Sequence, residues 1–403
     1  MMRLISIFTL WLLGPFGLFS QSDGKLDVLF LNRASLEASR EIFQNNPKHL
    51  PPALSALMKD ADNALKARPL SVMDKNQVPP SGDKHDYMSI ASYWWPDTTK
   101  PGGLPYIRRD GERNPYRYIV GDRGRIGTMV EQVQALALAY AITGKELFAK
   151  GATQRISVWF LDSRTKMNPN LKYAQYIEGS NEGRATGIID SHGFRDLIDA
   201  MVLLRGSPSW TEEVEHGLQQ WFTKYLSWLL ESENGKEEAA AKNNHGSIYD
   251  VQVCCYALFV GNEKIAKRVL REAGMKRIAV QIEPDGSQPL ELARTKSWGY
   301  SMLNTEALVD LAILGDRLGI DLWHFQTDDD RSLRKAIDFL IPYALGEKTW
   351  TWKQIIPFEY ERMYPIVKLA AVSLNDSSYA AAVNVLTQKR GGSPRMIFSL
   401  PAE

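Results

Sequence analysis

The sequence predicts an all-α protein: a single-domain α/α toroid or barrel of helical hairpins with long functional loops. Apolar residues recur at spacings of three and four along most of the chain, which is the pattern of amphipathic helices. Short turns separate most of these segments, as in antiparallel helical hairpins. Strand patterns are few and short, at 355–356 and 395–400. The sequence shows no fixed-period repeat, which argues against a consensus solenoid. An irregular helical bundle is the alternative.

Three segments rich in Pro, Gly and polar residues interrupt the helical pattern, at 71–122, 162–192 and 283–299. This density of helix breakers excludes long regular elements, and long irregular segments within a compact domain are often functional. We therefore expect functional residues there or at adjoining helix starts. The expected helices are 36–44, 50–67, 126–143, 145–161, 194–204, 211–232, 249–260, 263–280, 301–318, 329–345, 358–374 and 376–386.

Composition and charge narrow the function classes. The chain has 403 residues, of which 44% are hydrophobic and 24% are charged, as in an ordinary globular protein. Its net charge of +1 argues against non-specific nucleic-acid binding, so no nucleic-acid partner is expected. A local basic site for an acidic substrate remains compatible with this sum. The 11 Trp and 16 Tyr residues suit either a large helical core or stacking on sugar rings.

Residues 1–20 have the layout of a secretory signal peptide. Arg3 provides a positive charge, an apolar run extends from 4 to 19, and Ser20 precedes polar residues that suit cleavage. The run is short and is broken by a Gly-Pro pair, unlike a membrane span of ~20 apolar residues. We expect a mature catalytic domain at 21–403, periplasmic or secreted, with no membrane span.

Several common motifs for metal, nucleotide or nucleophile chemistry are absent from the sequence. It contains no CxxC, HExxH, GxGxxG, P-loop or GxSxG pattern. The adjacent Cys254 and Cys255 are poorly placed to form a disulfide with each other, and we expect them to be small buried residues. We expect no metal and no cofactor. Asp and Glu are plentiful, so a glycosidase with paired carboxylates stays open.

Two polar and aromatic clusters lie in the first two irregular segments. Tyr93, Trp94 and Trp95 stand together and form either a stacking platform for sugars or an anchor that pins the loop to the core. Gln175 and Arg184 carry donors for carboxylates and hydroxyls. Their alternative role is turn chemistry with a structural salt bridge.

Two further clusters lie at expected helix starts. Asn243, Asn244 and His245 offer amides for a carboxylate and a proton acceptor near neutral pH, or else a helix N-cap with an incidental histidine. A second sequence, from Glu291 to Tyr300, places two cations beside two aromatic residues. A positive field lowers a tyrosine pKa, which would suit Tyr300 to acid–base chemistry; a capping loop is the alternative.

A fifth cluster, KTWTWK at 348–353, alternates aromatic residues with basic or polar ones. It is either a short edge strand or a loop in contact with sugar. His192, which follows Asp190-Ser191, is the only other histidine in a comparable setting.

Together these motifs resemble the alginate lyase domain family of polysaccharide lyases. The matching text is SYWWPD at 92–97, MNPNLKYAQ at 167–175, GRATGIID at 183–190, NNHGSIYDVQ at 243–252 and DGSQPLELARTKSWGYS at 285–301. The motifs occur in order over more than 200 residues. The resemblance implies an α/α toroid that cleaves uronic-acid polysaccharides by β-elimination.

The implied chemistry matches the residue types. Elimination across C4–C5 of a uronate requires neutralisation of the C5 carboxylate, a base for the C5 proton and an acid for the leaving O4. Asn244 and Arg294 suit neutralisation, while His245 and Tyr300 suit the base and the acid. Tyr300 could serve as both for a mannuronate-type residue, and His245 would be the base for a guluronate-type residue. The expected substrate-binding residues are Asn243, Gln175, Arg184, Tyr93, Trp94, Trp95, Lys296, Trp298, His192 and Glu291.

The main hypothesis is an exported lyase that acts on alginate, a polymer of mannuronate and guluronate, and leaves 4,5-unsaturated uronate ends. A lyase for glucuronan or another uronic-acid polymer is the alternative within the same mechanism. A non-catalytic polysaccharide-binding protein and a toroidal glycoside hydrolase are the alternatives outside it. In every case but the last, the expected partner is an anionic uronic-acid polysaccharide.

Overall fold

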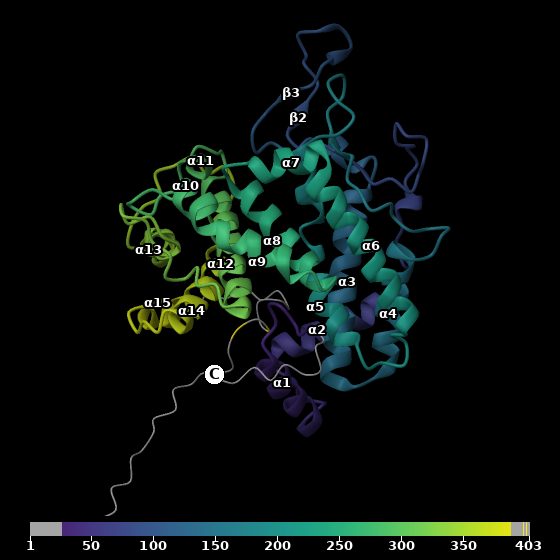
Figure 1. Ribbon diagram of the computed structural model, residues 1–403, viewed down its shortest axis with the longest axis horizontal. Coiled ribbons are helices and arrows are strands. Elements are labelled where there is room, and N and C mark those ends of the chain that lie inside the picture. Colours follow the sequence, from purple (N-terminus) through teal and green to yellow (C-terminus); the bar gives the residue numbers. More distant parts are fainter. Residues whose placement is uncertain (1–25, 388–397, 399, 401–403) are drawn as a thin grey trace, which may run out of the picture.

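The computed structural model describes residues 26–387, Phe398 and Leu400. The signal peptide expected at 1–20 lies outside these residues, as does most of the strand expected at 395–400. Helices dominate the described chain and form consecutive hairpins arranged in an arc, from α3 and α4 through α8, α9 and α12 to α13, α14 and α15 (Figure 1). This arrangement confirms the predicted α/α toroid.

The helices α1 and α2 lie below the arc in this view, and the irregular segments with β2 (Trp94–Trp95) and β3 (Ile107–Arg108) project above it, beside α7 (Figure 1). The α-helices are α1 (Arg33–Asn45), α2 (Pro52–Lys66), α3 (Asp122–Thr143), α4 (Glu146–Phe160), α5 (Phe194–Leu204), α6 (Glu212–Glu231), α7 (Glu233–Ala240), α8 (Asn244–Phe259), α9 (Glu263–Ala273), α10 (Ala279–Gln281), α11 (Pro289–Leu292), α12 (Ser297–Leu318), α13 (Leu333–Leu345), α14 (Met363–Ser373) and α15 (Tyr379–Thr387).

Several helix boundaries differ from the sequence prediction. Helix α8 begins five residues earlier than expected because the Asn243 side chain caps it, accepting a hydrogen bond from the backbone N–H of His245. Helix α12 likewise begins at Ser297, ahead of the expected position 301. Helix α7 was not predicted as a separate element; Ser232 ends α6 and caps α7. The strand expected at 355–356 is wrong, although the neighbouring Gln354 forms an isolated bridge with Lys296.

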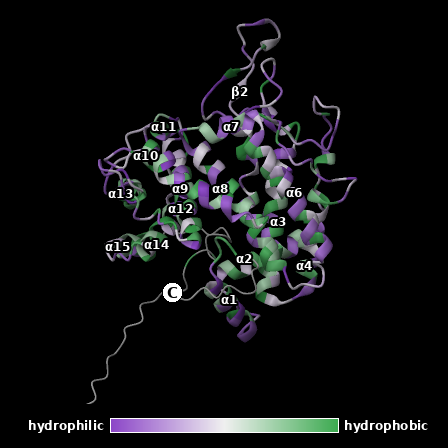
Figure 2. Cartoon of the chain, viewed as in Figure 1, coloured by the Kyte–Doolittle hydropathy of each residue, from purple (hydrophilic) through white to green (hydrophobic). Residues whose placement is uncertain are grey.

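Helix α8 runs through the middle of the apolar core. Every residue of it is buried except His245, near its start. Cys254 and Cys255 on this helix are buried free thiols, as predicted. Hydrophilic residues prevail in the loops at the end that carries β2 (Figure 2). None of the helices within the described residues is both long and apolar enough to span a bilayer.

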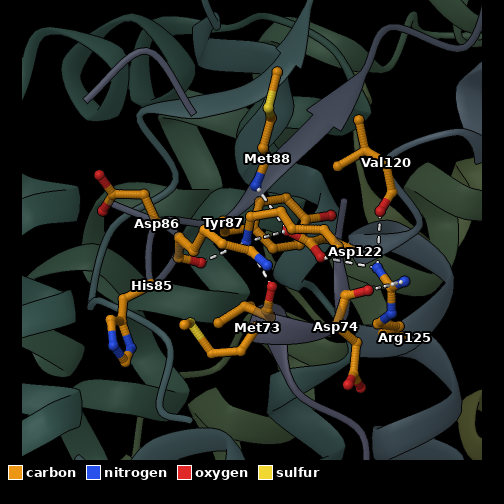
Figure 3. Close-up of polar contacts among 12 residues, drawn as sticks. Met73, Asp74, His85, Asp86, Tyr87, Met88, Val120, Asp122 and Arg125 are labelled. Atoms are coloured by element: carbon orange, nitrogen blue, oxygen red, sulfur yellow. Dashed lines mark hydrogen bonds and ion pairs between the residues drawn. The ribbon is translucent and has the colours of Figure 1, made fainter. Parts of the chain in front are cut away.

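A buried ion pair fastens the first irregular segment to α3. Lys75 Nζ lies 2.9 Å from Asp122 Oδ2, and both side chains are fully buried. Arg125 donates to Asp122, to the Val120 carbonyl and to the Asp74 carbonyl (Figure 3). Burial lowers the pKa of Lys75 and raises that of Asp122, because both charged forms lose hydration. Each charge therefore depends on the other.

Replacing Asp122 by Asn should destabilise the protein by about 3–5 kcal/mol, because the Lys75 charge would remain buried without its counter-charge. Equilibrium denaturation in urea measures the loss. Glu263→Gln, which removes the exposed pair with Lys267, is the matched control and should cost less than about 1 kcal/mol. Similar losses for the two variants would show that the buried pair does not anchor the segment.

Candidate active site

The irregular segments meet on the side of the helical arc that carries β2 and β3. Strand β1 (Met88–Ile90) pairs in parallel with β4 (Tyr173–Tyr176), and β2 (Trp94–Trp95) pairs with the antiparallel β3 (Ile107–Arg108). Helices α8 and α12 pack against each other, and side-chain contacts link both of their starts to this region. Segments far apart in sequence are thereby brought to one site.

Arg294 occupies the centre of this site. Its Nη2 donates to Asp110 Oδ1 at 2.7 Å and to the Tyr300 hydroxyl at 2.8 Å, and its guanidinium lies 3.8 Å from the centre of the Tyr300 ring. Burial by itself would raise the pKa of Asp110, but hydrogen bonds from Arg294 and Thr295 hold it well below its usual range. The pair is therefore fully charged, and Arg294 fixes the position of Tyr300.

Gly111 allows the Asp110 loop to approach the segment that carries Arg294 and Thr295. A Cβ at this position would lie 2.2 Å from Thr295 Oγ1, and its φ of +76° is in the left-handed region. Both features favour glycine. The Thr295 hydroxyl and backbone N–H each donate to Asp110, so this close approach secures the Arg294 partner.

Tyr300 and Tyr93 form a hydrogen-bonded pair. The Tyr300 hydroxyl donates to the Tyr93 hydroxyl at 2.9 Å. Burial raises the pKa of Tyr300 well above its usual value and outweighs the Arg294 charge. The expectation that cations would lower the pKa of Tyr300 is therefore wrong. Burial also opposes ionisation of Tyr93, but the Tyr300 hydrogen bond and the charge of Lys296, followed by Arg113 and Arg294, outweigh it and lower the Tyr93 pKa.

Asn244 is held beneath the surface by Glu291. Its backbone N–H and its Nδ2 each donate to the Glu291 carboxylate at 2.7 Å, and the two residues are 0% and 1% exposed. The Glu291 carboxylate thus binds the first turn of α8, where backbone N–H groups are free. Both were expected to act on substrate, and these roles stay predictions. Glu291 holds the start of α8, while Asn244 Oδ1 has no hydrogen-bond partner among the described residues.

His245 is oriented by a carboxylate that the sequence analysis missed. Its Nδ1 lies 2.6 Å from Glu238 Oε1, and Glu238 is buried on α7. Donation from Nδ1–H to Glu238 leaves Nε2 as the acceptor in the neutral ring. Gly246 permits the tight approach of α7, since a Cβ there would lie 2.2 Å from both the Ala241 carbonyl and Arg277 Nη1.

Gln175 and Arg184 belong to a second polar network. Arg184 donates to Gln175 Oε1 at 3.0 Å, and Gln175 Nε2 donates to Asp190 at 2.9 Å. Asp190 is also 3.2 Å from Arg123, which donates to Ser92 beside Tyr93. Gln175 is only 6% exposed and has a φ of +51°. It positions Arg184, whose guanidinium lies 5.8 Å from the Trp94 ring centre.

The other expected binding residues have different contacts: one lies against an aromatic ring, one caps a helix and one is bonded to a loop carbonyl. Lys296 lies 5.3 Å from the Tyr93 ring centre, and Asn243 caps α8. Trp95 is partly exposed and donates from Nε1 to the Glu112 carbonyl. His192 is half buried and forms the C-cap of the 3₁₀ helix Ala185–Ser191.

Trp298 does not face substrate in this structure. It is 1% exposed and packs in an aromatic cluster, with ring centres 5.2 Å from Trp350 and 5.5 Å from Phe358. The expectation of a substrate contact at Trp298 is therefore contradicted by its burial. Alternation along the helix explains this, because Trp298 and Tyr300 lie about 200° apart around α12.

The structure adds Asp110, Arg123, Asp190 and Glu238 to the site. Asp110 and Asp190 lie within the irregular segments 71–122 and 162–192, where functional residues were expected. No sequence pattern distinguished these two acids from the many others in the chain. Arg113 and Arg117 add positive charge near Tyr93 and Arg123. Within residues 26–387, no group of three or more His, Cys, Asp or Glu side chains could hold a metal ion.

Comparison with known proteins identifies the family. The alginate lyase family matches residues 71–350. The chain belongs to this family. An alginate lyase from Bacteroides ovatus has a solved structure that is 40% identical and superposes with a TM-score of 0.86, covering 92% of this chain and 98% of its own. The protein is therefore a polysaccharide lyase. No curated protein matches the chain.

Two more distant alginate lyase structures share the fold. Alginate lyase A1-III from Sphingomonas species A1 is 13% identical with a TM-score of 0.56, covering 93% of this chain and 98% of its own. A histidine-to-alanine variant of A1-III, complexed with a tetrasaccharide, is 13% identical with a TM-score of 0.60, covering 93% and 96%. At 13% identity, this likeness shows a shared fold and nothing more.

Tyr93 should be the tyrosine that this site makes more acidic. In a spectrophotometric titration of the folded protein, Tyr93→Phe should remove one phenol that ionises below the usual tyrosine pKa of about 10. Tyr300→Phe should instead move that ionisation to higher pH, because the hydrogen bond to Tyr93 is lost. A Tyr93→Phe curve that matches the parent below pH ~10 would contradict the assigned pair.

Proposed function

We propose that this lyase cleaves alginate by β-elimination and leaves a 4,5-unsaturated uronate at the new end. The observation that carries the proposal is the 2.8 Å contact between Arg294 and the Tyr300 hydroxyl, within a site that also contains His245. The 40% identity to the Bacteroides ovatus alginate lyase supports the substrate. The tetrasaccharide bound by the A1-III variant supports an oligosaccharide ligand for this fold.

Neutralisation of the substrate carboxylate falls to the cations around Tyr93 and Tyr300. Asn244, predicted to share this role, has a buried Oδ1 without a hydrogen-bond partner among the described residues, and the side chains of Arg294 and Arg123 are 16% and 33% exposed. Together with Arg184 they supply guanidinium groups suited to a carboxylate. Stabilising the carboxylate makes the adjacent C5 proton more acidic, which is the first requirement of the elimination.

Proton transfer falls to Tyr300 and His245. The raised pKa of Tyr300 keeps its phenol protonated at neutral pH, so it can deliver a proton to O4 as the C4–O4 bond breaks. The C5–H bond breaks in the same elimination, its electron pair forms the C4=C5 double bond, and the proton passes to a base. For guluronate-type residues, His245 offers Nε2 as that base. For mannuronate-type residues, Tyr300 takes up the C5 proton after giving its own to O4, within its hydrogen-bonded pair with Tyr93.

The alternative substrate is glucuronan or another uronic-acid polymer, which undergoes the same elimination. We also propose that the enzyme is periplasmic or secreted, as the N-terminal sequence supports. Incubation with alginate, polymannuronate, polyguluronate and glucuronan, followed by the ultraviolet absorbance of the unsaturated product, tests the substrate. Alginate and its two homopolymers should give product; product from glucuronan alone would favour the alternative, and none from any polymer would contradict the function.

Tyr300→Phe should lower kcat by about 10²–10⁴-fold, because the ring remains but the transferable proton is lost. Tyr140→Phe makes the same chemical change near the opposite end of α3 and serves as the control, with kcat expected to stay at the parent value. Circular dichroism establishes that both variants are folded. If Tyr300→Phe retains kcat within about threefold of the parent, well short of the general-acid range, Tyr300 is not the acid.

A further inference from the structure

The KTWTWK segment and α13 form a mixed aromatic and basic surface that the active site does not use. We propose that this surface is a second contact site for the acidic polysaccharide, a proposal that rests on the proposed function. We call it the Trp352 platform, defined by Phe339, Tyr343, Trp352, Lys335 and Lys348. It would bind uronate units of the same polymer whose other units occupy the site around Tyr300.

The two tryptophans of the segment have different environments. Trp350 packs against Trp298 and donates from Nε1 to Ser297 Oγ at 2.8 Å. Trp352 is partly exposed, with its ring centre 5.6 Å from that of Phe339 and 6.0 Å from that of Tyr343. The inner tryptophan fixes the segment, and the outer one contributes to a rigid, half-exposed aromatic surface of the kind that binds amphipathic rings.

A hollow of about 270 Å³ adjoins these rings. Its lining includes Phe339 and Tyr343 together with Lys335, Lys348, Asp285 and Asp338. This volume is close to the lower end of the range for ligand pockets, ~300 Å³. It suits contact with a single sugar unit of a chain that continues over the surface.

Two lysines and two aspartates line this hollow, and their surroundings differ. Asp338 accepts a hydrogen bond from the Tyr379 hydroxyl at 2.8 Å, and Asp285 accepts one from the backbone N–H of Ser287 at 2.9 Å. By contrast, the ion pairs found among the described residues include neither Lys335 nor Lys348. Both acids thus have donors within the protein, and Asp338 also lies 3.7 Å from Arg334, whereas the two ammonium groups are available to the carboxylates of a polymer.

The platform is joined directly to the catalytic segment. The backbone N–H of Ser297 donates to the Lys353 carbonyl at 3.2 Å, and that of Ile355 donates to the Thr295 carbonyl at 3.0 Å. The platform segment therefore runs beside the chain that carries Arg294 and Tyr300. A polymer that spans both sites would bind more tightly than an oligosaccharide that fills only one of them.

Polymer binding to a Tyr300→Phe background tests the platform without turnover. Adding Lys335→Glu and Lys348→Glu should weaken binding of long alginate by roughly three- to tenfold, as expected for losing about 1 kcal/mol. Binding of a short oligosaccharide should change little. Trp352→Ala should act in the same direction, and the lysine variants serve if this one fails to fold.

Lys264→Glu on α9 is the matched control, because it reverses one exposed charge away from the platform. It should bind the polymer as the Tyr300→Phe parent does. Equal polymer affinity for the platform variants and this control would overturn the platform. Equal losses for the short and long ligands would also overturn it, since the platform would then not be a separate site. A parent enzyme that forms no unsaturated product would instead contradict the proposed function.

Discussion

The ion pair between Asp110 and Arg294 is the interaction on which the active site depends. It joins an irregular loop, between β3 and α3, to the chain that enters α12, 184 residues later. The same guanidinium holds the Tyr300 hydroxyl, and Tyr300 in turn donates to Tyr93. One cation thereby sets the position of the proposed acid and the approach of a segment that carries three aromatic residues.

Burial distributes the protons in this site. Two phenols share a hydrogen bond, yet the pKa of Tyr300 is raised and that of Tyr93 is lowered. Burial opposes ionisation of both phenols, but the hydrogen bond from Tyr300 and the Lys296 ammonium over the Tyr93 ring favour the ionised form of Tyr93. The result is a protonated donor beside a more acidic acceptor, an arrangement suited to giving a proton to a leaving oxygen and recovering it.

The sequence was sufficient to predict the helical architecture and the segments that meet at the site. Helical periodicity identified most of the helices, and breakers marked the irregular segments. It could not show which polar groups are buried. Asn244, Glu291 and Gln175 look like substrate ligands in the sequence, but the packed structure buries all three. It joins Asn244 to Glu291, and Gln175 to Arg184 and Asp190. Trp298 was misassigned for the same reason, since exposure depends on which side of α12 it faces.

The partners that orient His245 and Arg294 could not be predicted from the sequence either. Glu238 lies on a different helix from His245, and Asp110 is separated from Arg294 by 184 residues. Neither pairing follows from sequence spacing. The predicted direction of the Tyr300 pKa shift was wrong. The neighbouring cations could be read from the sequence, whereas the larger effect of burial on the phenol could not.

A double-mutant cycle with Asp110→Asn and Tyr300→Phe tests the central claim most directly, that Asp110 acts on the reaction through Arg294 and Tyr300. The cycle compares kcat/KM on alginate for the parent, both single variants and the double variant. If these residues act as one unit, Asp110→Asn should lower activity in the parent but have little further effect once Tyr300 is Phe. Equal factors in both backgrounds would contradict the account, because Asp110 would then act independently of Tyr300.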